Sequence, residues 1–314
     1  MNKLIKNILL SVSFVPLIAI NTACSNTLNK ADHPGFSIAG QIDDKRIKES
    51  SGLAYSTRSE GVLWTINDSG NKAEIYAINE DGERLGTVKL KGVKNKDWED
   101  ISSFKYKGKS YLLIADVGDN KAKRDSLFLH FIKEPKQKDL SKNDKLKISP
   151  SWSTEFSYED GPRDCESVAV NVSHEQVLLL SKRNQPPVLY QLPLVDQAKK
   201  GKQRAQRIMP LTSLTPANPN DIRNLKHMAF NGQPTAMDIS KDYKSAIVLT
   251  YLRAYYFSNP KANNSIDVFQ SKPQIIELPY LEQAEAISFG KNNKTAFITS
   301  EGRPTPLLKL NLTP

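Results

Sequence analysis

The sequence has little cysteine and little histidine, and these shortages exclude several kinds of site. Of its 314 residues, two are cysteine and four are histidine. The histidines are scattered, without a His-x-His or His-Glu-x-x-His spacing, so neither a zinc site nor a Ser-His-Asp triad is predicted. A Gly-x-Ser-x-Gly motif and a glycine-rich phosphate loop are missing as well. Cys165, inside the run Asp-Cys-Glu-Ser-Val-Ala-Val, is expected to be a small buried hydrophobe.

Long hydrophobic runs are confined to the N-terminus. Lys3 and Lys6 precede an almost wholly apolar run over 8–20, and Thr22-Ala23 then lead to Cys24. This pattern predicts a secretory signal over 1–23. The Ala23-Cys24 junction resembles a bacterial lipoprotein signal, in which the cysteine is lipidated and becomes the first residue. Three residues earlier, Asn21 stands where that signal usually has leucine.

The resemblance implies a chain anchored by lipid, in the outer membrane and facing the periplasm, with a tether over 24–35 and one domain over 36–314. The alternative is cleavage nearby and a soluble periplasmic protein. If Cys24 is lipidated, no disulfide can form within the chain, so the core must hold without one.

Acidic residues are fewer than basic ones. Without residues 1–23 the chain keeps 42 basic and 34 acidic residues, a net charge of +8. The lysines are spread along the chain and are not interleaved with aromatics, so no nucleic-acid platform is predicted. This excess of positive charge is interpreted as a solvated protein surface. The alternative is that it suits an anionic small molecule. Such a chain is expected to be a monomer that meets the membrane through its N-terminal lipid.

A sustained 3.6-residue periodicity is also missing, apart from a weak one over 194–200. From Phe36 onward the apolar runs are four to seven residues long, rich in Val, Ile, Leu, Tyr and Phe, and bounded by Gly, Asn, Asp or Pro. Short strands separated by turn residues are typical of an all-β fold.

One short signature recurs and predicts the architecture. It combines an aliphatic residue with a small one, at intervals of 48, 67, 71 and 48 residues, in Ser51-Gly-Leu-Ala, Glu99-Asp-Ile-Ser, Glu166-Ser-Val-Ala, Met237-Asp-Ile-Ser and Glu285-Ala-Ile-Ser. Further apolar strands follow each copy, among them a predicted third strand over Ser265–Phe269 in the fourth repeat. The last repeat runs out of chain, and Phe36–Ile42 can complete it. The pattern predicts a β-propeller of five blades closed by an N-terminal strand. The alternative is six blades, with an irregular one hidden in 212–230.

In a propeller the first strand of every blade lines the central channel. Side chains two residues apart share one side of a strand. The acids therefore gather at one end of the first three blades, where Glu49, Glu99, Asp100 and Glu166 begin first strands and Asp68, Asp116 and Asp119 end second strands. Clustered carboxylates are hard ligands that suit Ca²⁺ or Mg²⁺. The same residues can instead pair with arginines or cap their own turns.

Basic residues end the second strands of the third, fourth and fifth blades: Lys182 and Arg183, Arg253, and Arg303. Cations opposite a metal suit a phosphate or carboxylate. The mouth of the channel is thus predicted to be acidic on one side and basic on the other, and to receive an anionic small molecule.

Four motifs carry a resemblance to a family. Glu49-Ser-Ser-Gly-Leu, Leu63-Trp-Thr-Ile-Asn-Asp-Ser-Gly, Asp97-Trp-Glu-Asp-Ile and Ala115-Asp-Val-Gly-Asp-Asn resemble those of exported bacterial β-propeller proteins, which look like distant relatives of the phytase-like and esterase-like propellers. In phytase-like propellers, carboxylates at the channel mouth hold calcium ions that bind phosphate and activate water. The resemblance implies such roles for Glu49, Asp68, Glu99, Asp100, Asp116, Asp119 and Glu166, although a full phytase ligand set does not align.

Three functions follow as expectations. The first is a binding or interaction module for an anionic small molecule or an envelope protein. It would contain a divalent-cation site that can hold Ca²⁺. The second is a calcium-dependent hydrolase of phosphate or carboxylic esters, with Glu99 or Asp116 as base. It requires Glu99, Asp116 and Asp119 to lie within about 5 Å of one another. The third, weaker, is tachylectin-like sugar binding.

Overall fold

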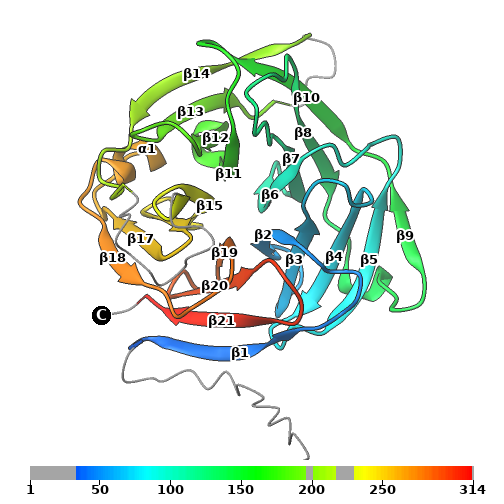
Figure 1. Ribbon diagram of the computed structural model, residues 1–314. Coiled ribbons are helices and arrows are strands. Elements are labelled where there is room, and N and C mark those ends of the chain that lie inside the picture. The colour runs from blue at the N-terminus through cyan, green and yellow to red at the C-terminus, as the bar shows by residue number, and fades with distance from the viewer. Residues whose placement is uncertain (1–32, 196–200, 217–229, 313–314) are drawn as a thin grey trace, which may run out of the picture.

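The computed structural model describes residues 33–195, 201–216 and 230–312, and within them the chain is almost entirely β-structure. The sheets stand around a common centre like the sectors of a disc (Figure 1). The innermost strands are β2 (Ser50–Tyr55), β6 (Trp98–Tyr106), β11 (Cys165–Asn171), β15 (Pro234–Ile239) and β19 (Ala284–Phe289). Each contacts the next, and β19 contacts β2, so these strands close a ring.

Each innermost strand begins an antiparallel meander that runs outward. The second strands are β3 (Val62–Asn67), β7 (Lys109–Asp116), β12 (Gln176–Ser181), β16 (Ser245–Thr250) and β20 (Thr295–Ser300). The third strands are β4 (Glu74–Asn79), β8 (Leu127–Lys133), β13 (Val188–Pro193), β17 (Arg253–Ser258) and β21 (Thr305–Asn311). The outermost strands are β5 (Arg84–Leu90), β10 (Trp152–Tyr158), β14 (Gln203–Pro210), β18 (Gln274–Glu277) and β1 (Phe36–Ile42).

The described residues form four sheets, whereas the repeats predict five separate ones. The difference arises at the rim, where β10 and β14 pair in parallel and join two meanders into one eight-stranded sheet. A short strand, β9 (Lys145–Ile148), adds to β5, also in parallel. The remaining elements are the short 3₁₀-helices η1 (Gln137–Asp139) and η2 (Val172–His174) and the helix α1 (Ser265–Phe269).

One predicted strand is wrong. Ser265–Phe269 is the helix α1, because Asn264 caps it: its side chain accepts hydrogen bonds from the backbone of Ile266 and Asp267, and the Asp267 side chain accepts one from the Asn264 backbone. The third strand of that meander is β17 (Arg253–Ser258), which pairs with β16 and β18. Most of the weak helical pattern over 194–200 lies outside the described residues.

The N-terminal strand β1 lies beside the last strand of the chain, as predicted. β1 pairs antiparallel with β21 from Phe36 opposite Leu310 to Ile42 opposite Thr305. The fourth strand of this sheet therefore comes from the start of the chain (Figure 1).

The apolar core lies between neighbouring sheets rather than at the centre of the ring. Trp64 and Trp98, both fully buried, share one cluster with residues of β2 to β8. All six residues of β2 are buried, because both faces of an inner strand meet a neighbour. Alternation of polar and apolar residues is accordingly lost in the inner strands.

Two aspartates of the repeated signature tie one innermost strand to the next. Asp100 accepts hydrogen bonds of 2.8 Å from the backbone N–H of Ile101 and, on β11, of Val168. Asp238 does the same with Ile239 and with Phe289 on β19. Such bonds satisfy buried backbone donors where two sheets meet.

Candidate functional site: an acidic cluster at the channel mouth

Three carboxylates meet at one end of the ring. Asp97 directly precedes β6, Glu99 is the second residue of β6, and Asp68 follows β3. One oxygen from each lies within 4.8 Å of the others. Asp97 and Glu99 share a side of the strand because they are two residues apart, while Trp98 between them points into the core. The hairpin with β7 fixes this end of β6, since Trp98 lies opposite Asp116.

Gly118, just beyond β7, makes room for two of these carboxylates. A Cβ atom at this position would stand 2.1 Å from Glu99 Oε1 and 2.5 Å from Asp97 Oδ2. The backbone N–H of Gly118 donates to the Asp97 carbonyl at 3.2 Å, which holds the two segments together. The close approach of the carboxylates to the backbone thus requires glycine here.

The cluster carries little compensation for its charge. Within the part of the chain that the structure describes, no hydrogen bond reaches the carboxylate of Asp97 or Glu99, although Glu99 is only 5% exposed. Asp68 accepts a hydrogen bond from the Ser69 N–H. Burial, reinforced by Asp68, raises the pKa of Asp97 to about 6. Burial and the nearby Glu166 raise the pKa of Glu99 well above its usual value. A buried carboxylate without a partner is costly unless a proton or a cation compensates it.

A cavity of about 220 Å³ opens beside the cluster. Asp68 and Glu99 form part of one wall, and the other residues that line it are Asn120, Glu166, Lys182, Arg183, Phe230, Gln233, Tyr251, Gln283 and Glu285. Gln233 is 8% exposed, and its Oε1 atom has no hydrogen-bond partner among the described residues. The cavity thus presents an unpaired acceptor in addition to the acids.

The far wall of this cavity is a connected polar network. The Lys182 ammonium pairs with Glu166 and donates to the Tyr251 hydroxyl at 3.1 Å. Tyr251 and Gln283 both donate to Glu285 Oε1, at 3.0 and 2.8 Å, and Gln283 also donates to Glu301 at 2.6 Å. Each buried acid on this side therefore has a donor.

The titration of this network follows from burial and charge. Burial raises the pKa of Glu166 to about 8, although the ammonium of Lys182 opposes the shift. Burial alone would lower the pKa of Lys182, but Glu166, Tyr251 and Glu285 raise it well above its usual value. Lys182 is therefore protonated across the physiological range.

Several residues predicted for the metal site face elsewhere. Asp116 pairs with Arg124 at 2.6 Å. Asp119 accepts hydrogen bonds from the backbone N–H of Lys123 and Arg124, at 2.9 and 2.8 Å, and so caps its own loop. Asp100 links the inner strands, as described above. Glu99, Asp116 and Asp119 thus do not form a common cluster.

Glu49 and Glu166 lie near the cluster but have partners of their own. Glu49 accepts a hydrogen bond of 2.6 Å from the Asn71 amide. Glu166 lines the cavity, paired with Lys182.

The basic residues predicted for the mouth divide in a similar way. Lys182 and Arg183 line the cavity, and Arg183 pairs with Asp164 at 2.7 Å. Arg253 pairs with Glu277 of β18 at 2.7 Å, and Arg303 lies 3.9 Å from Asp43, so neither lines the cavity. Cys24, the predicted lipidation site, lies outside the described residues.

The sequence pattern placed Asp97 among the acids at this end of the ring and Gln283 on the channel side, but it did not predict either as a ligand, and it did not predict Gln233 or Tyr251. Asp97 and Gln283 each stand two residues before the recurrent signature, which is why the pattern placed them on the channel side. Gln233 follows a long segment without a strand pattern, so the sequence pattern could not predict that Gln233 lies at the cavity.

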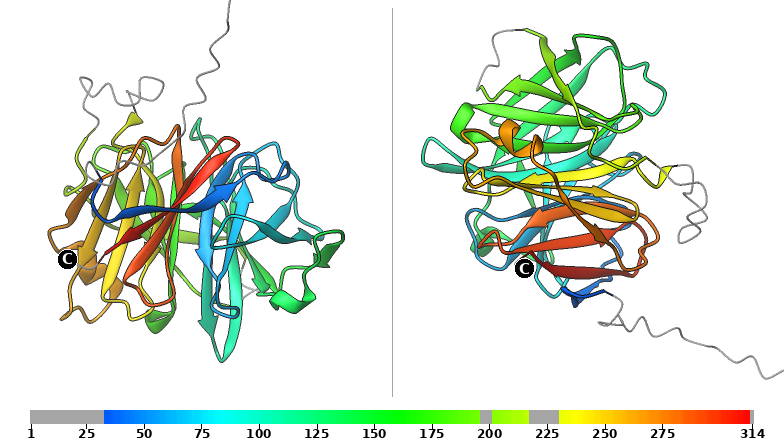
Figure 2. Two further views of the ribbon diagram at one scale, coloured as in Figure 1. Left: turned by 90° about the horizontal axis from the view of Figure 1, so that it is seen from below. Right: turned by 90° about the vertical axis from the view of Figure 1, so that its left-hand side faces the viewer.

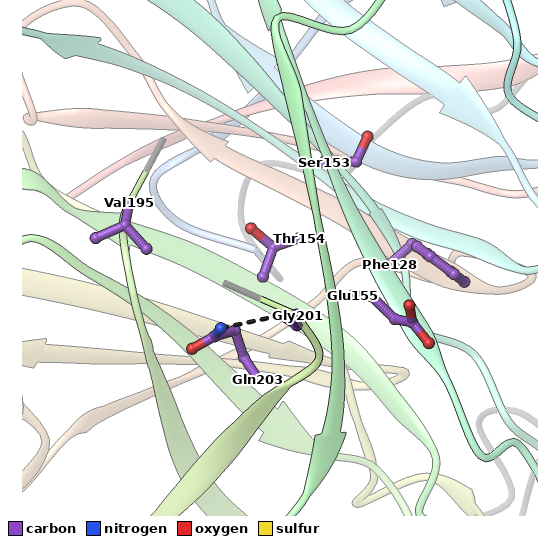
Figure 3. A pocket seen from close by; sticks show the side chains of 7 residues that line it. All are labelled: Phe128, Ser153, Thr154, Glu155, Val195, Gly201 and Gln203. Carbon is purple, nitrogen blue, oxygen red and sulfur yellow. Dashed lines mark hydrogen bonds between the residues drawn. The ribbon is translucent and has the colours of Figure 1, made fainter. Parts of the chain in front are cut away.

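A second cavity of about 230 Å³ lies at the rim, where β8, β10 and β14 meet (Figure 3). β10 and β14 pair over only three residues each, so the strands diverge beyond that pairing. Its one acid, Glu155, accepts a hydrogen bond from Ser126 at 2.5 Å. Nothing in its lining indicates a reaction.

Comparisons with known proteins bear on the fold. No protein-family model and no curated protein sequence matches the chain. Among solved structures, the Malassezia sympodialis allergen Mala s 1 is similar over 88% of this chain and 96% of its own, with a TM-score of 0.52 and 11% identity. A luciferin-regenerating enzyme covers 87% of this chain and 95% of its own, with 9% identity and a TM-score of 0.41. The likeness to the allergen supports a β-propeller-like fold.

In the described residues, no helix is long and apolar enough to cross a membrane.

Proposed function

We propose that this chain is a five-bladed β-propeller that acts as a binding module, with a divalent-cation site at one end of its central channel. The blade count rests on the ring of innermost strands, each of which starts a four-stranded meander when β1 is counted with β19, β20 and β21. The parallel pairing of β10 with β14 joins two blades at the rim without altering the ring.

The observation that carries the cation site is the position of Glu99. Its carboxylate is buried, lines the cavity, has no hydrogen bond among the described residues, and lies with Asp68 and Asp97 inside 4.8 Å. A cation held by these oxygens would compensate the burial and the mutual repulsion that raise their pKa values. Carboxylate oxygens are the preferred ligands of Ca²⁺, which also accepts water in its coordination shell. Calcium is therefore the proposed ion.

The ligand of the module is proposed to be an anionic small molecule. Bound calcium would add two positive charges to a cavity that already contains the Lys182 ammonium and the half-exposed guanidinium of Arg183. A carboxylate or phosphate can then contact the ion and the cationic wall together. Gln233 adds hydrogen-bonding capacity on the same side.

The hydrolase alternative has less support from the geometry. Asp116 is paired with Arg124, and Asp119 caps its own loop, so the three-residue cluster that this function requires is missing from the described residues. Glu99 alone remains as a candidate base.

Export and lipid attachment at Cys24 complete the proposal. They rest on the sequence of residues 1–24, and the outer membrane facing the periplasm is the proposed location.

Calcium titration of the purified chain by isothermal calorimetry and by thermal melting tests the cation site. We expect calcium to raise the melting temperature, and Asp97→Asn to weaken calcium binding by at least about tenfold, the loss of one charged ligand. Asp119→Asn is the matched control, since it removes the same charge nearby from a residue that caps its own loop. A wild-type melting temperature that does not change with calcium would refute the site. Equal losses of calcium affinity in Asp97→Asn and Asp119→Asn would refute it as well.

A further inference from the structure

The end of the ring opposite the acidic cluster carries a basic prominence. The hairpin of β6 and β7 is longer than its counterparts: β6 has nine residues, whereas β2, β15 and β19 have six. Because the mouth ends of these strands are in register, the extra residues project from the opposite end. At about 3.3 Å per residue, the three extra residues lengthen this strand by roughly 10 Å. The projection can be followed in Figure 2.

Cations surround a cavity at the base of this tip. The cavity measures about 480 Å³ and is lined by Thr57, Arg58, Lys105, Gly108, Lys109, Ser110 and Lys133. Its four charged residues are all basic and all exposed. Lys105, Lys109 and Lys133 form no ion pair with any described residue. Like charges gathered without counter-charge repel each other, so the arrangement costs free energy unless an anionic partner offsets it.

Acids near the tip have other partners, and one of them, Glu175, accepts a hydrogen bond from the Tyr106 hydroxyl at 2.9 Å. Glu134 is fully buried, and its side chain accepts hydrogen bonds from Thr57, Trp64 and Ser103. Arg58 donates to the Glu134 carbonyl, which holds the guanidinium at the edge of the cavity. Glu60 pairs with Lys291 at 2.6 Å. None of these carboxylates neutralises the lysines of the tip.

We propose that this basic tip contacts an anionic lipid surface. A projecting tip with several independent lysines fits a flat array of phosphate groups, whereas a site for one small anion would need converging donors with fixed positions. Polybasic segments bind anionic bilayers through the summed attraction of each charge. The contact does not depend on calcium binding, because the tip and the acidic cluster stand at opposite ends of the ring. It also does not require a lipid at Cys24.

The experiment measures co-sedimentation of residues 25–314 with phosphatidylcholine vesicles, with and without phosphatidylglycerol. This chain keeps every described strand, since β1 begins at Phe36. We expect binding only to the anionic vesicles. The triple variant Lys105→Glu, Lys109→Glu, Lys133→Glu should bind on the order of 100-fold more weakly or worse, because each lysine near the surface adds about fivefold.

The matched control reverses three exposed lysines at the other end, Lys94→Glu, Lys121→Glu and Lys123→Glu, and should bind like the wild type. Equal loss in both triple variants would show an unspecific charge effect and overturn the proposal. Wild-type binding that is absent, or indifferent to phosphatidylglycerol, would do the same. Displacement by millimolar phosphate, beyond that by chloride at equal ionic strength, would assign the tip to a small anion instead. Unchanged calcium affinity and melting temperature in the tip variant separate this result from a failure of the cation site.

Discussion

The two walls of the channel mouth hold similar numbers of buried or half-buried acids, but these acids differ in their hydrogen-bond partners. On one wall, Glu166 and Glu285 accept hydrogen bonds from Lys182 and Tyr251. On the other, Glu99 and Asp97 have no such donor among the described residues. On the first wall the acids are already stabilised by donors, whereas on the second wall a bound cation would stabilise them. The position of the hydrogen-bond donors, and not the number of acids, therefore distinguishes a structural network from a candidate cation site.

The largest expected effect comes from converting the compensated wall into an uncompensated one. Lys182→Met removes the ammonium and leaves Glu166 and Glu285 buried without it. We expect a loss of about 3–5 kcal/mol in the free energy of unfolding, the usual cost of breaking a buried pair. Denaturant unfolding at pH 7.5 measures it. The double variant Lys182→Met, Glu166→Gln should recover most of the loss, and a single variant within 1 kcal/mol of the wild type would contradict the comparison.

A steric change on the other wall should be smaller. Gly118→Ala leaves every charge in place, but its Cβ needs the space of the Glu99 and Asp97 carboxylates. Because both are flexible side-chain ends, the metal-free fold should tolerate the methyl group while the cluster is forced apart. We expect calcium affinity to fall about tenfold, or 1.4 kcal/mol, by calorimetry. Gly118 is not among the glycines at positive φ, so the methyl group acts by its size and adds no strain of that kind to the backbone. Calcium affinity that survives Gly118→Ala unchanged would place the ion elsewhere.

The smallest expected effect is a dependence on pH. Burial raises the pKa of Asp97 from 3.8 to about 6, so the folded state holds this proton more tightly than the unfolded state. Its contribution to stability is full below about pH 3.8 and is lost as pH rises through about 6. Since Asp97 is partly exposed, solvent screening reduces it to on the order of 1 kcal/mol.

Unfolding of the metal-free chain at pH 5 and pH 7.5 measures this difference. Asp97→Asn should reduce it by about that amount without abolishing it, because burial also raises the pKa of Asp238 to about 6 and that of Glu301 to about 7. Calcium should stabilise the chain at pH 7.5 and much less at pH 5, because protons compete for the same oxygens. A difference between the two pH values that persists unchanged in Asp97→Asn would assign it to another group.

The strands were predictable because each leaves a local mark. The recurrent inner-strand signature marked β2, β6, β11, β15 and β19, and the pairing of Phe36–Ile42 with the end of the chain followed from a missing strand. Ser265–Phe269 was misread because its five residues suit a strand, whereas the cap formed by Asn264 and Asp267 decided for a helix.

The site was only partly predictable, for a different reason. The gathering of acids at one end follows from strand direction, and Asp68 and Glu99 do meet there. Whether an acid is free depends on loops that fold back, as when Arg124 returns to Asp116 and Asp119 takes up its own loop's N–H groups. These loop contacts follow no repeating sequence pattern. The pattern therefore cannot distinguish an acid that is free to bind a metal from one that caps its own loop.

The pairing of β1 with β21 also sets an order of events during folding. Phe36 lies opposite Leu310, so the first strand in the chain can pair only after the last strand has been synthesised. Contacts so distant in sequence close late, since the entropy of a long loop must be overcome first. Until then β1 and β21 each expose an unpaired edge, which invites pairing with other chains. The pairing of β1 with β21 is therefore the step that removes these two edges and protects the chain from aggregation.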